Sequence, residues 1–483
     1  MVGSSRLKLV LLLACGGLLA VVTASAEGAI AILTGSSLVV LVALPLALRL
    51  RRDSLDAPGL YAIFFAATLG VTSIAWLGTP NDPGPGLDRA DVADALLVVA
   101  AGLAAFSLGA IFAAGQAREL PPPRASTVRP NLTLLALAYG VAAATTVVGV
   151  ATHTYGYLGE ESAAQTFGAA SGVLPFVASL TGLTILITGI WSLHTGDRRC
   201  RWLVLAMLAI QLPLGFIAGF KGESVVPFVL LGLAAVAYGR PIPWRAVLIG
   251  ALLVFGLLVP ANQAYRKGVR GEDGGVLAGL KRAASPGNYR PDRIAKRPVE
   301  YVFDRFRNID AVALIKRDTG TVYASPDGAL YAKLPLMVTV PRQLWADKPV
   351  LDTGGDFATS SWERAPSYRT SEPLTQPGDL FRNFGWAGVA VGLFAWGIVI
   401  GVWQRARRRM WSPRMLAIYL WSLPAGVLYI EGDLPNLVAT QAKAIPIAAL
   451  AAWFLLPGRR HAPGYRALAN RLLPRRANLD SAA

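Results

Sequence analysis

The chain has 483 residues, of which 54% are hydrophobic and only 16% are charged, and its mean hydropathy is +0.48. This balance would leave a water-soluble domain short of polar surface, so the composition predicts an integral membrane protein. The formal net charge of +17 does not predict a nucleic-acid partner, because Lys and Arg fall mainly in short segments between apolar runs.

Apolar runs long enough to cross roughly 30 Å of hydrocarbon recur along the chain. We predict an all-α polytopic membrane protein with about 12 transmembrane helices. The predicted spans are 8–26, 28–48, 59–78, 92–115, 131–152, 172–193, 202–219, 225–239, 245–262, 384–403, 414–430 and 436–456. They divide the chain into helices 1 to 9 (1–262), a large loop (263–383), helices 10 to 12 (384–456) and a basic tail (457–483).

Lys and Arg in the flanks give the orientation, since positive residues are retained on the cytoplasmic side. With a cytoplasmic N-terminus, 24 Lys and Arg residues of the short segments and the tail lie inside, and only Arg89 and Lys221 lie in the short outer loops. Both termini are therefore predicted to be cytoplasmic. The first run also resembles a signal peptide with a cleavage site at Ala24-Ser25-Ala26, and cleavage would leave the later orientations unchanged.

The large loop at 263–383 is predicted to be extracytoplasmic, and it carries 19 Lys and Arg against 14 Asp and Glu. Long loops translocate despite positive charge. Apolar residues at three-to-four spacing predict an amphipathic helix over Lys296–Arg317, and Leu330–Val340 is apolar but too short to span. Two explanations for the excess positive charge stay open. The charge could belong to a surface that faces solvent or lipid headgroups, or to a site for an anionic ligand.

The second half of this loop interleaves cations with aromatic residues. Pro341-Arg342, Trp345 and Lys348-Pro349 are followed by a polar stretch and then by Gly378-Asp379-Leu380-Phe381-Arg382-Asn383-Phe384-Gly385. Arg binds phosphate oxygens through two hydrogen bonds, and aromatic rings stack on apolar sugar faces. The pattern favours a ligand that joins phosphate to sugar.

At these residues the chain resembles the Wzy-type oligosaccharide repeat-unit polymerases, which are O-antigen polymerase-like proteins of bacterial surface polysaccharide synthesis. A looser similarity lies in Gly219-Phe220-Lys221-Gly222-Glu223-Ser224. The resemblance implies a glycosyltransferase of the bacterial cytoplasmic (inner) membrane. This enzyme would transfer a growing glycan from undecaprenyl pyrophosphate to a sugar hydroxyl of a second lipid-linked repeat unit at the extracytoplasmic face. It also implies lipid-linked oligosaccharide, membrane lipids, a flippase and a chain-length regulator as partners.

Fixed cations would stabilise the pyrophosphate that leaves. The outward-facing segments hold no Asp-x-Asp pair and no His cluster, so we predict a reaction without metal ion or cofactor. The substrate-binding candidates are Lys221, Arg342, Trp345, Lys348, Arg364, Arg369, Arg382 and Lys443. Lys221 could instead be an ordinary loop charge, and Lys443 could extend to the membrane interface.

A general base would help to remove the proton of the acceptor hydroxyl. Asp347, Glu363 and Asp379 are the candidates, with Glu431 and Asp433 as further acids, and for each one taken alone the role of a salt-bridge partner is favoured over that of the base. Two other functions stay open. O-antigen ligases share this layout, and 12 helices with both ends inside are also common in transporters.

Overall fold

The computed structural model describes most of the chain between residues 15 and 456. The described residues are 15–78, 80, 83–116, 120, 129–152, 155, 173–219, 221–241, 244–269, 275–285, 306–321, 325–340, 344–345, 353–363 and 372–456. They form helices joined by turns, and no extended β-strand occurs among them.

A short helix at Cys15–Ser25 comes first. The helices of the first half are α2 (Gly28–Ala47), η1 (Leu48–Arg51), α3 (Ala57–Phe65), η2 (Ala66–Gly70), η3 (Val71–Leu77), α4 (Arg89–Ala114), α5 (Leu132–Ala151), α7 (Val173–Thr195), α8 (Arg198–Ile217), α9 (Lys221–Ala237), α10 (Trp244–Leu253) and η5 (Val254–Leu258). Those that follow are α11 (Val259–Val269), α12 (Val276–Ala284), α15 (Ile309–Asp318), α16 (Ala329–Thr339), α17 (Thr353–Ser360), α18 (Gln376–Arg409), α19 (Pro413–Leu423), η8 (Pro424–Leu428) and α20 (Leu434–Leu455).

The protein is a helical membrane protein, as the composition predicts. Within the described part of the chain, eight helical segments are long and apolar enough to cross a membrane. These segments are Gly28–Arg51, Ala57–Leu77, Arg89–Ala114, Leu132–Ala151, Val177–Thr195, Arg198–Ile217, Gln376–Arg409 and Leu434–Leu455. The count of twelve spans and the cytoplasmic position of the termini stay predictions.

Each of the twelve predicted runs overlaps a helix, and α18 is the helix that starts furthest before its run. α18 begins at Gln376 rather than at 384, and it bends at Gly385, whose φ is 62° and ψ is −150°. The large loop contributes α12, α15, α16 and α17. Of the amphipathic helix predicted over Lys296–Arg317, Ile309–Asp318 is helical, and residues 296–305 lie outside the described residues.

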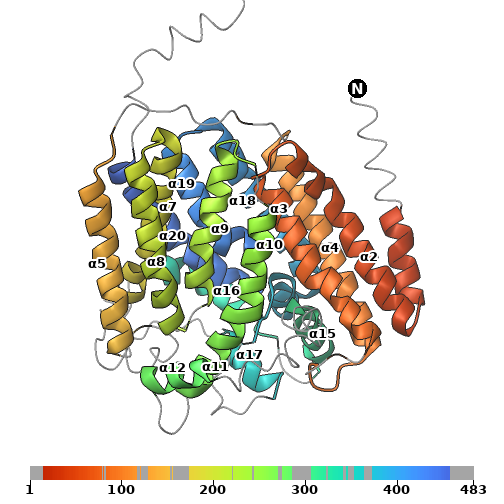
Figure 1. Ribbon diagram of the computed structural model, residues 1–483. Coiled ribbons are helices and arrows are strands. Elements are labelled where there is room, and N and C mark those ends of the chain that lie inside the picture. Colours follow the sequence, from red (N-terminus) through yellow and green to blue (C-terminus); the bar gives the residue numbers. More distant parts are fainter. Residues whose placement is uncertain are drawn as a thin grey trace, which may run out of the picture.

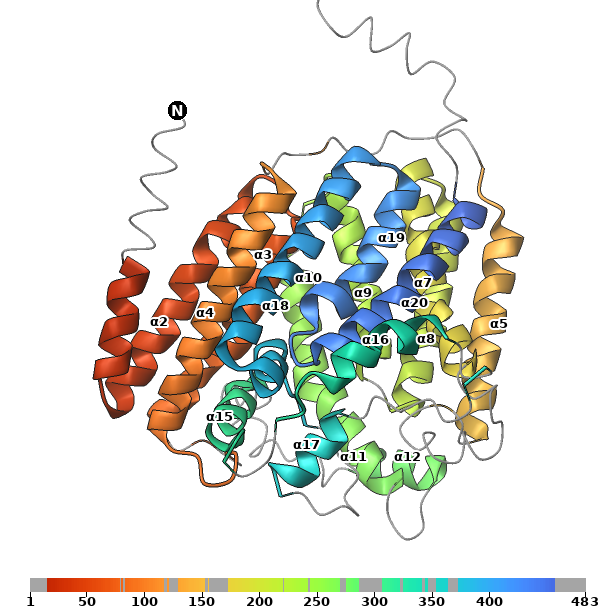
Figure 2. The same ribbon diagram turned by 180° about the vertical axis from the view of Figure 1, so that it is seen from behind.

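The helices stand side by side in one bundle. Figure 1 shows α5, α7, α8 and α9 toward one edge and α2, α3 and α4 toward the other. α11, α12, α15 and α17 gather at one end of the bundle, which we call the loop end. From behind, Figure 2 shows α18, α19 and α20 next to each other, with α16 beside α20 toward the loop end.

Small residues let α4 and α18 approach each other closely. A Cβ on Gly109 would lie 2.1 Å from the Phe394 carbonyl oxygen. A Cβ on Gly397 would lie 2.2 Å from the Phe106 carbonyl oxygen. Gly401 meets Ala113 in the same way, at 2.8 Å. Helices in lipid associate through such close van der Waals packing, because lipid tails remove the hydrophobic drive between them. α18 is therefore held along its length by α4.

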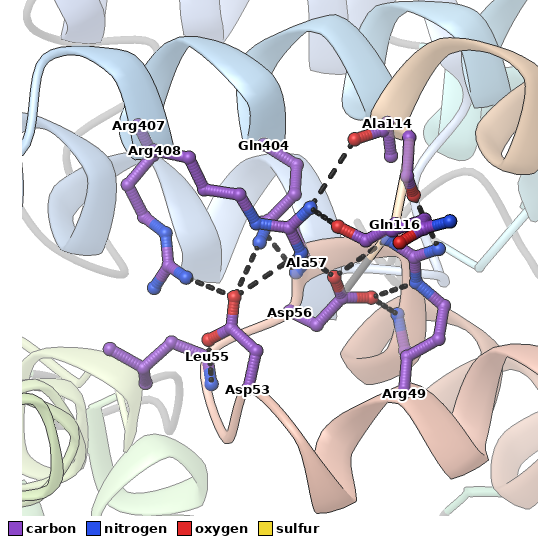
Figure 3. A network of polar contacts seen from close by, with 12 residues as sticks. Arg49, Asp53, Leu55, Asp56, Ala57, Ala114, Gln116, Gln404, Arg407 and Arg408 are labelled. Carbon is purple, nitrogen blue, oxygen red and sulfur yellow. Dashed lines mark hydrogen bonds and ion pairs between the residues drawn. The ribbon is translucent and has the colours of Figure 1, made fainter. Parts of the chain in front are cut away.

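A buried network of charges joins α18 to the first helices at the end of the bundle opposite the loop end (Figure 3). Asp53 accepts hydrogen bonds from Gln404 (2.9 Å), Arg407 and Arg408 (3.3 Å). Asp56 pairs with Arg49 and with Arg408, both at 2.8 Å. The side chain of Arg407 is 1% exposed and lies over the Tyr419 ring, 4.8 Å from its centroid.

The network combines three guanidinium groups with two carboxylates. Removing the water around buried charges costs several kcal/mol per ion, so such groups persist only when each has close partners. Asp56 also accepts from the Gly59 amide at 3.2 Å and thereby caps α3. Arginines that the orientation rule uses as topology markers therefore also fasten α18 to α2 and α3.

Replacing Asp53 with Asn should lower the free energy of unfolding by about 3–5 kcal/mol, because Arg407 would lose a buried counter-charge. Thermal unfolding of the detergent-solubilised protein, followed by loss of monodisperse protein, measures the effect. The double variant Asp53→Asn/Arg407→Met is the control and should recover part of the lost stability. A single variant as stable as the parent would contradict this role of the network.

Candidate functional site

The polar site begins where α18 starts. Thr375 adopts a left-handed backbone conformation, with φ 63°, and its side chain caps α18 by accepting a hydrogen bond from the Gly378 amide at 3.2 Å. A Cβ on Gly378 would lie 2.9 Å from Ile315 of α15, so only glycine fits without a shift. The first turn of α18 is thus pressed against the loop helix α15.

α15 is in turn fixed by a buried ion pair. The Asp310 carboxylate accepts hydrogen bonds from Trp76 Nε1, from Arg307 Nε (both 2.9 Å) and from the Gly84 amide (3.4 Å). Burial raises the pKa of Asp310, against the opposite influence of Arg307. These contacts tie the loop to the first helices, so α15 gives the start of α18 a fixed support.

Asp379, in the first turn of α18, is 2% exposed. Its carboxylate accepts hydrogen bonds from the Tyr331 hydroxyl, from Asn383 Nδ2 at 3.1 Å and from the Leu434 amide at 3.4 Å. Asn383 also accepts a hydrogen bond from the Gly328 amide at 3.3 Å. Asp379 therefore joins the start of α18 to α16 and to the start of α20.

A second buried acid lies beside this cluster. Asp433 caps α20 by accepting from the Asn436 amide at 2.7 Å, and it accepts from Thr353 of α17 at 2.5 Å. Burial, together with the charges of Asp379 and Asp433, raises the pKa of Tyr331. Two short loop helices, α16 and α17, and the starts of the two long helices α18 and α20 thus meet around two carboxylates and one phenol.

An apolar groove of about 1090 Å³ runs from this cluster along α18, with α19, η8 and α20 as its other walls. Tyr331, Leu380 and Leu434 line its loop end, and Trp403 lies at the far end. From residue 380 to 403, α18 covers roughly 30 Å or more at about 1.5 Å per residue. That length matches the hydrocarbon thickness of a bilayer. The groove can hold an extended apolar chain with its polar end near Tyr331.

A separate polar cavity of about 440 Å³ lies among α7, α8, α9, α11 and α19. Its lining includes Gln211, Glu223, Arg266 and the ring of Trp421. Glu223 accepts a hydrogen bond from the Tyr155 hydroxyl, and Arg266 Nε donates to the Gly219 carbonyl at 2.8 Å. Since α8 ends and α9 begins here, the cavity lies toward the loop end of the bundle.

The structure brings two of the predicted site residues together. Asp379 lies in the cluster, and the half-buried Arg382 lies one turn further along α18. Trp345 is half-buried, Glu363 is exposed with φ 53°, and Lys443 is exposed on α20. The side chain of Lys221 lies outside the described residues, as do Arg342, Asp347, Lys348, Arg364 and Arg369. The roles of all these residues stay predictions.

Sequence reasoning missed Tyr331, Gln211, Glu223 and Arg266 as site residues. A signal existed for Gln211, which is the single amide in the apolar run at 202–219, because a polar side chain within a span is a functional candidate. Glu223 belongs to the segment with the looser family similarity, in which only Lys221 is a predicted site residue. Tyr331 and Arg266 can be recognised as site residues only from the folded structure, in which the loop packs against the bundle.

Comparison with known proteins adds no assignment: no family model, no curated protein and no solved structure matches the chain. Within the described residues, no group of three His, Cys, Asp or Glu side chains is placed to hold a metal ion.

Replacing Asp379 with Asn should destabilise the protein by about 1.5–3 kcal/mol, the usual worth of hydrogen bonds to a charged group. The amide replaces one acceptor oxygen with a donor, so the donors at Tyr331, Asn383 and Leu434 can no longer all be satisfied. The thermal unfolding midpoint in detergent checks this. Asp356→Asn, on the exposed side of α17, is the control and should leave the midpoint unchanged. Equal midpoints for both variants would contradict the anchoring role.

Proposed function

We propose that this protein is an integral membrane glycosyltransferase that polymerises oligosaccharide repeat units linked to undecaprenyl pyrophosphate. The observation that carries the proposal is the apolar groove of about 1090 Å³ that ends at the polar cluster of Tyr331 and Asp379. Such a site suits an amphipathic substrate whose long apolar chain is joined to a polar head. The reaction would take place at the loop end, which the charge distribution predicts to be extracytoplasmic.

The composition of the groove supports a lipid chain rather than a hydrophilic solute. Apart from two Trp indoles, the polar side chains among its described lining residues are Tyr331, Ser422 and Gln441. Ser422 is occupied, since it donates to the Tyr419 carbonyl at 2.7 Å and accepts from Trp403 at 2.9 Å. Burying an apolar chain here is favourable at about 25 cal/mol per Å².

The cations of the loop would supply the other half of the substrate site. Arg382 follows Asp379 by one turn, and Arg342, Lys348, Arg364 and Arg369 belong to the same loop. When the glycosidic bond to the pyrophosphate breaks, negative charge builds on the leaving oxygen, and guanidinium groups stabilise it through paired hydrogen bonds. Of these residues, Arg342, Lys348 and Arg382 belong to the segments that resemble Wzy-type polymerases.

Deleting the gene should stop polymer formation and lead to accumulation of single lipid-linked repeat units, because their consumption would cease. Extraction of lipid-linked sugars and mass spectrometry measure the accumulation. Expression of the parent protein from a plasmid should restore the polymer. Full-length polymer that is not attached to its final carrier would indicate a ligase instead. Unchanged polysaccharide with altered solute uptake would indicate a transporter.

Filling the groove should weaken substrate use. Ala395 lines the groove from α18, and a Trp side chain in its place would occupy the path of the lipid chain. We expect a fall in polymer yield of roughly tenfold, which corresponds to a loss of about 1.4 kcal/mol of binding. Leu137→Trp, on the exposed surface of α5, is the matched control. Full polymer yield with well-expressed Ala395→Trp would argue against the groove as the lipid site.

A further inference from the structure

The polar cavity among α7, α8, α9, α11 and α19 has no assigned ligand. Gln211 is 2% exposed and lines the cavity, and its side-chain oxygen Oε1 has no hydrogen-bond partner. A buried carbonyl oxygen without a donor costs about 1–3 kcal/mol. Such a cost is recovered when a ligand supplies the missing donor, so the cavity calls for a ligand that carries O–H or N–H groups.

The other lining groups narrow the class of ligand. Glu223 brings a carboxylate and Arg266 brings a guanidinium, so the described lining holds one formal charge of each sign and favours a ligand without net charge. Trp421 and Pro227 add a flat apolar surface on the same cavity. Hydrogen-bonding groups on one side and an aromatic face on another suit a sugar, whose rim is polar and whose ring faces are apolar. The volume of about 440 Å³ lies within the ordinary range for small-molecule sites.

Two close contacts give the cavity its fixed shape. A Cβ on Gly215 of α8 would lie 2.6 Å from the Ser224 hydroxyl of α9, so these helices touch next to Glu223. A Cβ on Gly182 of α7 would lie 3.2 Å from the Trp421 ring. The Tyr155 hydroxyl donates a hydrogen bond to one carboxylate oxygen of Glu223, and Glu223 lines the cavity. The carboxylate is therefore positioned before any ligand arrives.

We propose that this cavity binds the acceptor sugar, and that Glu223 is the catalytic base that receives the proton of its hydroxyl. The inference rests on the proposed function and identifies the site of its second substrate. A base must lie within hydrogen-bond reach of the hydroxyl that it deprotonates. Glu223 lines a cavity, whereas Asp379 is absent from the described lining of both the cavity and the groove.

The acceptor hydroxyl oxygen forms a bond to the anomeric carbon of the donor sugar while its proton passes to the Glu223 carboxylate. The bond from that carbon to the pyrophosphate oxygen breaks, and its electron pair leaves with the pyrophosphate. The loop cations stabilise the charge on the leaving group. Glu223 then returns its proton to water, and no oxidant or reductant is needed.

The test uses the full-length protein in lipid vesicles, supplied with lipid-linked repeat units extracted from the deletion strain. Glu223→Gln should lower the rate of polymer formation about 100-fold or more, the usual contribution of a general base. The amide still accepts the Tyr155 hydrogen bond, so the variant should fold. Glu223→Asp, which keeps a carboxylate, should recover part of the rate. Glu27→Gln, on an exposed turn before α2, is the matched control and should match the parent.

A second measurement separates this inference from the proposed function. Binding of the repeat oligosaccharide, released from its lipid, is followed by saturation-transfer NMR with parent protein and with Gln211→Leu. Loss of binding in Gln211→Leu supports the cavity as the sugar site. Polymer formation by the parent together with a folded Glu223→Gln variant within threefold of its rate would overturn Glu223 as the base, and unchanged binding by Gln211→Leu would overturn the sugar site. A parent protein that makes no polymer would overturn the proposed function instead.

Discussion

The close packing of α18 against α4 is the contact on which the rest of the arrangement depends. Glycines at 109, 397 and 401 bring the two backbones together, and the Asp53 and Asp56 network locks the far end of α18 to α2 and α3. α18 supplies one wall of the apolar groove and also carries Asp379 at its start. A displacement of this one helix would therefore change the groove and the acid cluster together. Membrane helices lack a hydrophobic drive toward each other, so this rigidity must come from packing and buried polar contacts.

Much of the helical layout could be predicted from the sequence because the bilayer imposes one strong rule. Every backbone group must be paired inside the hydrocarbon, so an apolar run of sufficient length becomes a helix. The start of α18 could not be predicted by that rule, since Gln376, Asp379 and Asn383 read as loop residues. They are helical because tertiary partners satisfy them: Tyr61 donates to Gln376, and Tyr331 donates to Asp379. Polar residues near a span end reveal their structure only through such partners.

The candidate site was less predictable than the fold, for a related reason. Charge and aromatic patterns single out the polar segments of the loop sequence that contain Arg342 and Lys348. The groove and the polar cavity are instead made by residues far apart in sequence, such as Tyr331 with Leu434 and Gln211 with Arg266. No local period joins these pairs. Asp379 illustrates the difference between sequence and structure. The sequence marks it as a possible base, whereas its buried contacts show that it also holds α16, α18 and α20 together.

α19 lines both the polar cavity and the apolar groove, so one helix separates a polar site from an apolar one. Trp421 faces the polar cavity and Ser422 faces the groove, as neighbouring residues on a helix point about 100° apart. A transferase that joins a lipid-bound donor to a sugar acceptor must hold the apolar lipid chain and the polar sugar ring in different surroundings. The reacting ends of the two substrates must still meet. A single mixed cavity would bind each part poorly, because polar groups without partners are costly next to apolar chain. The apolar groove and the polar cavity offer two such surroundings that share α19, and in the proposed function the charged pyrophosphate would lie among the cations of the basic loop.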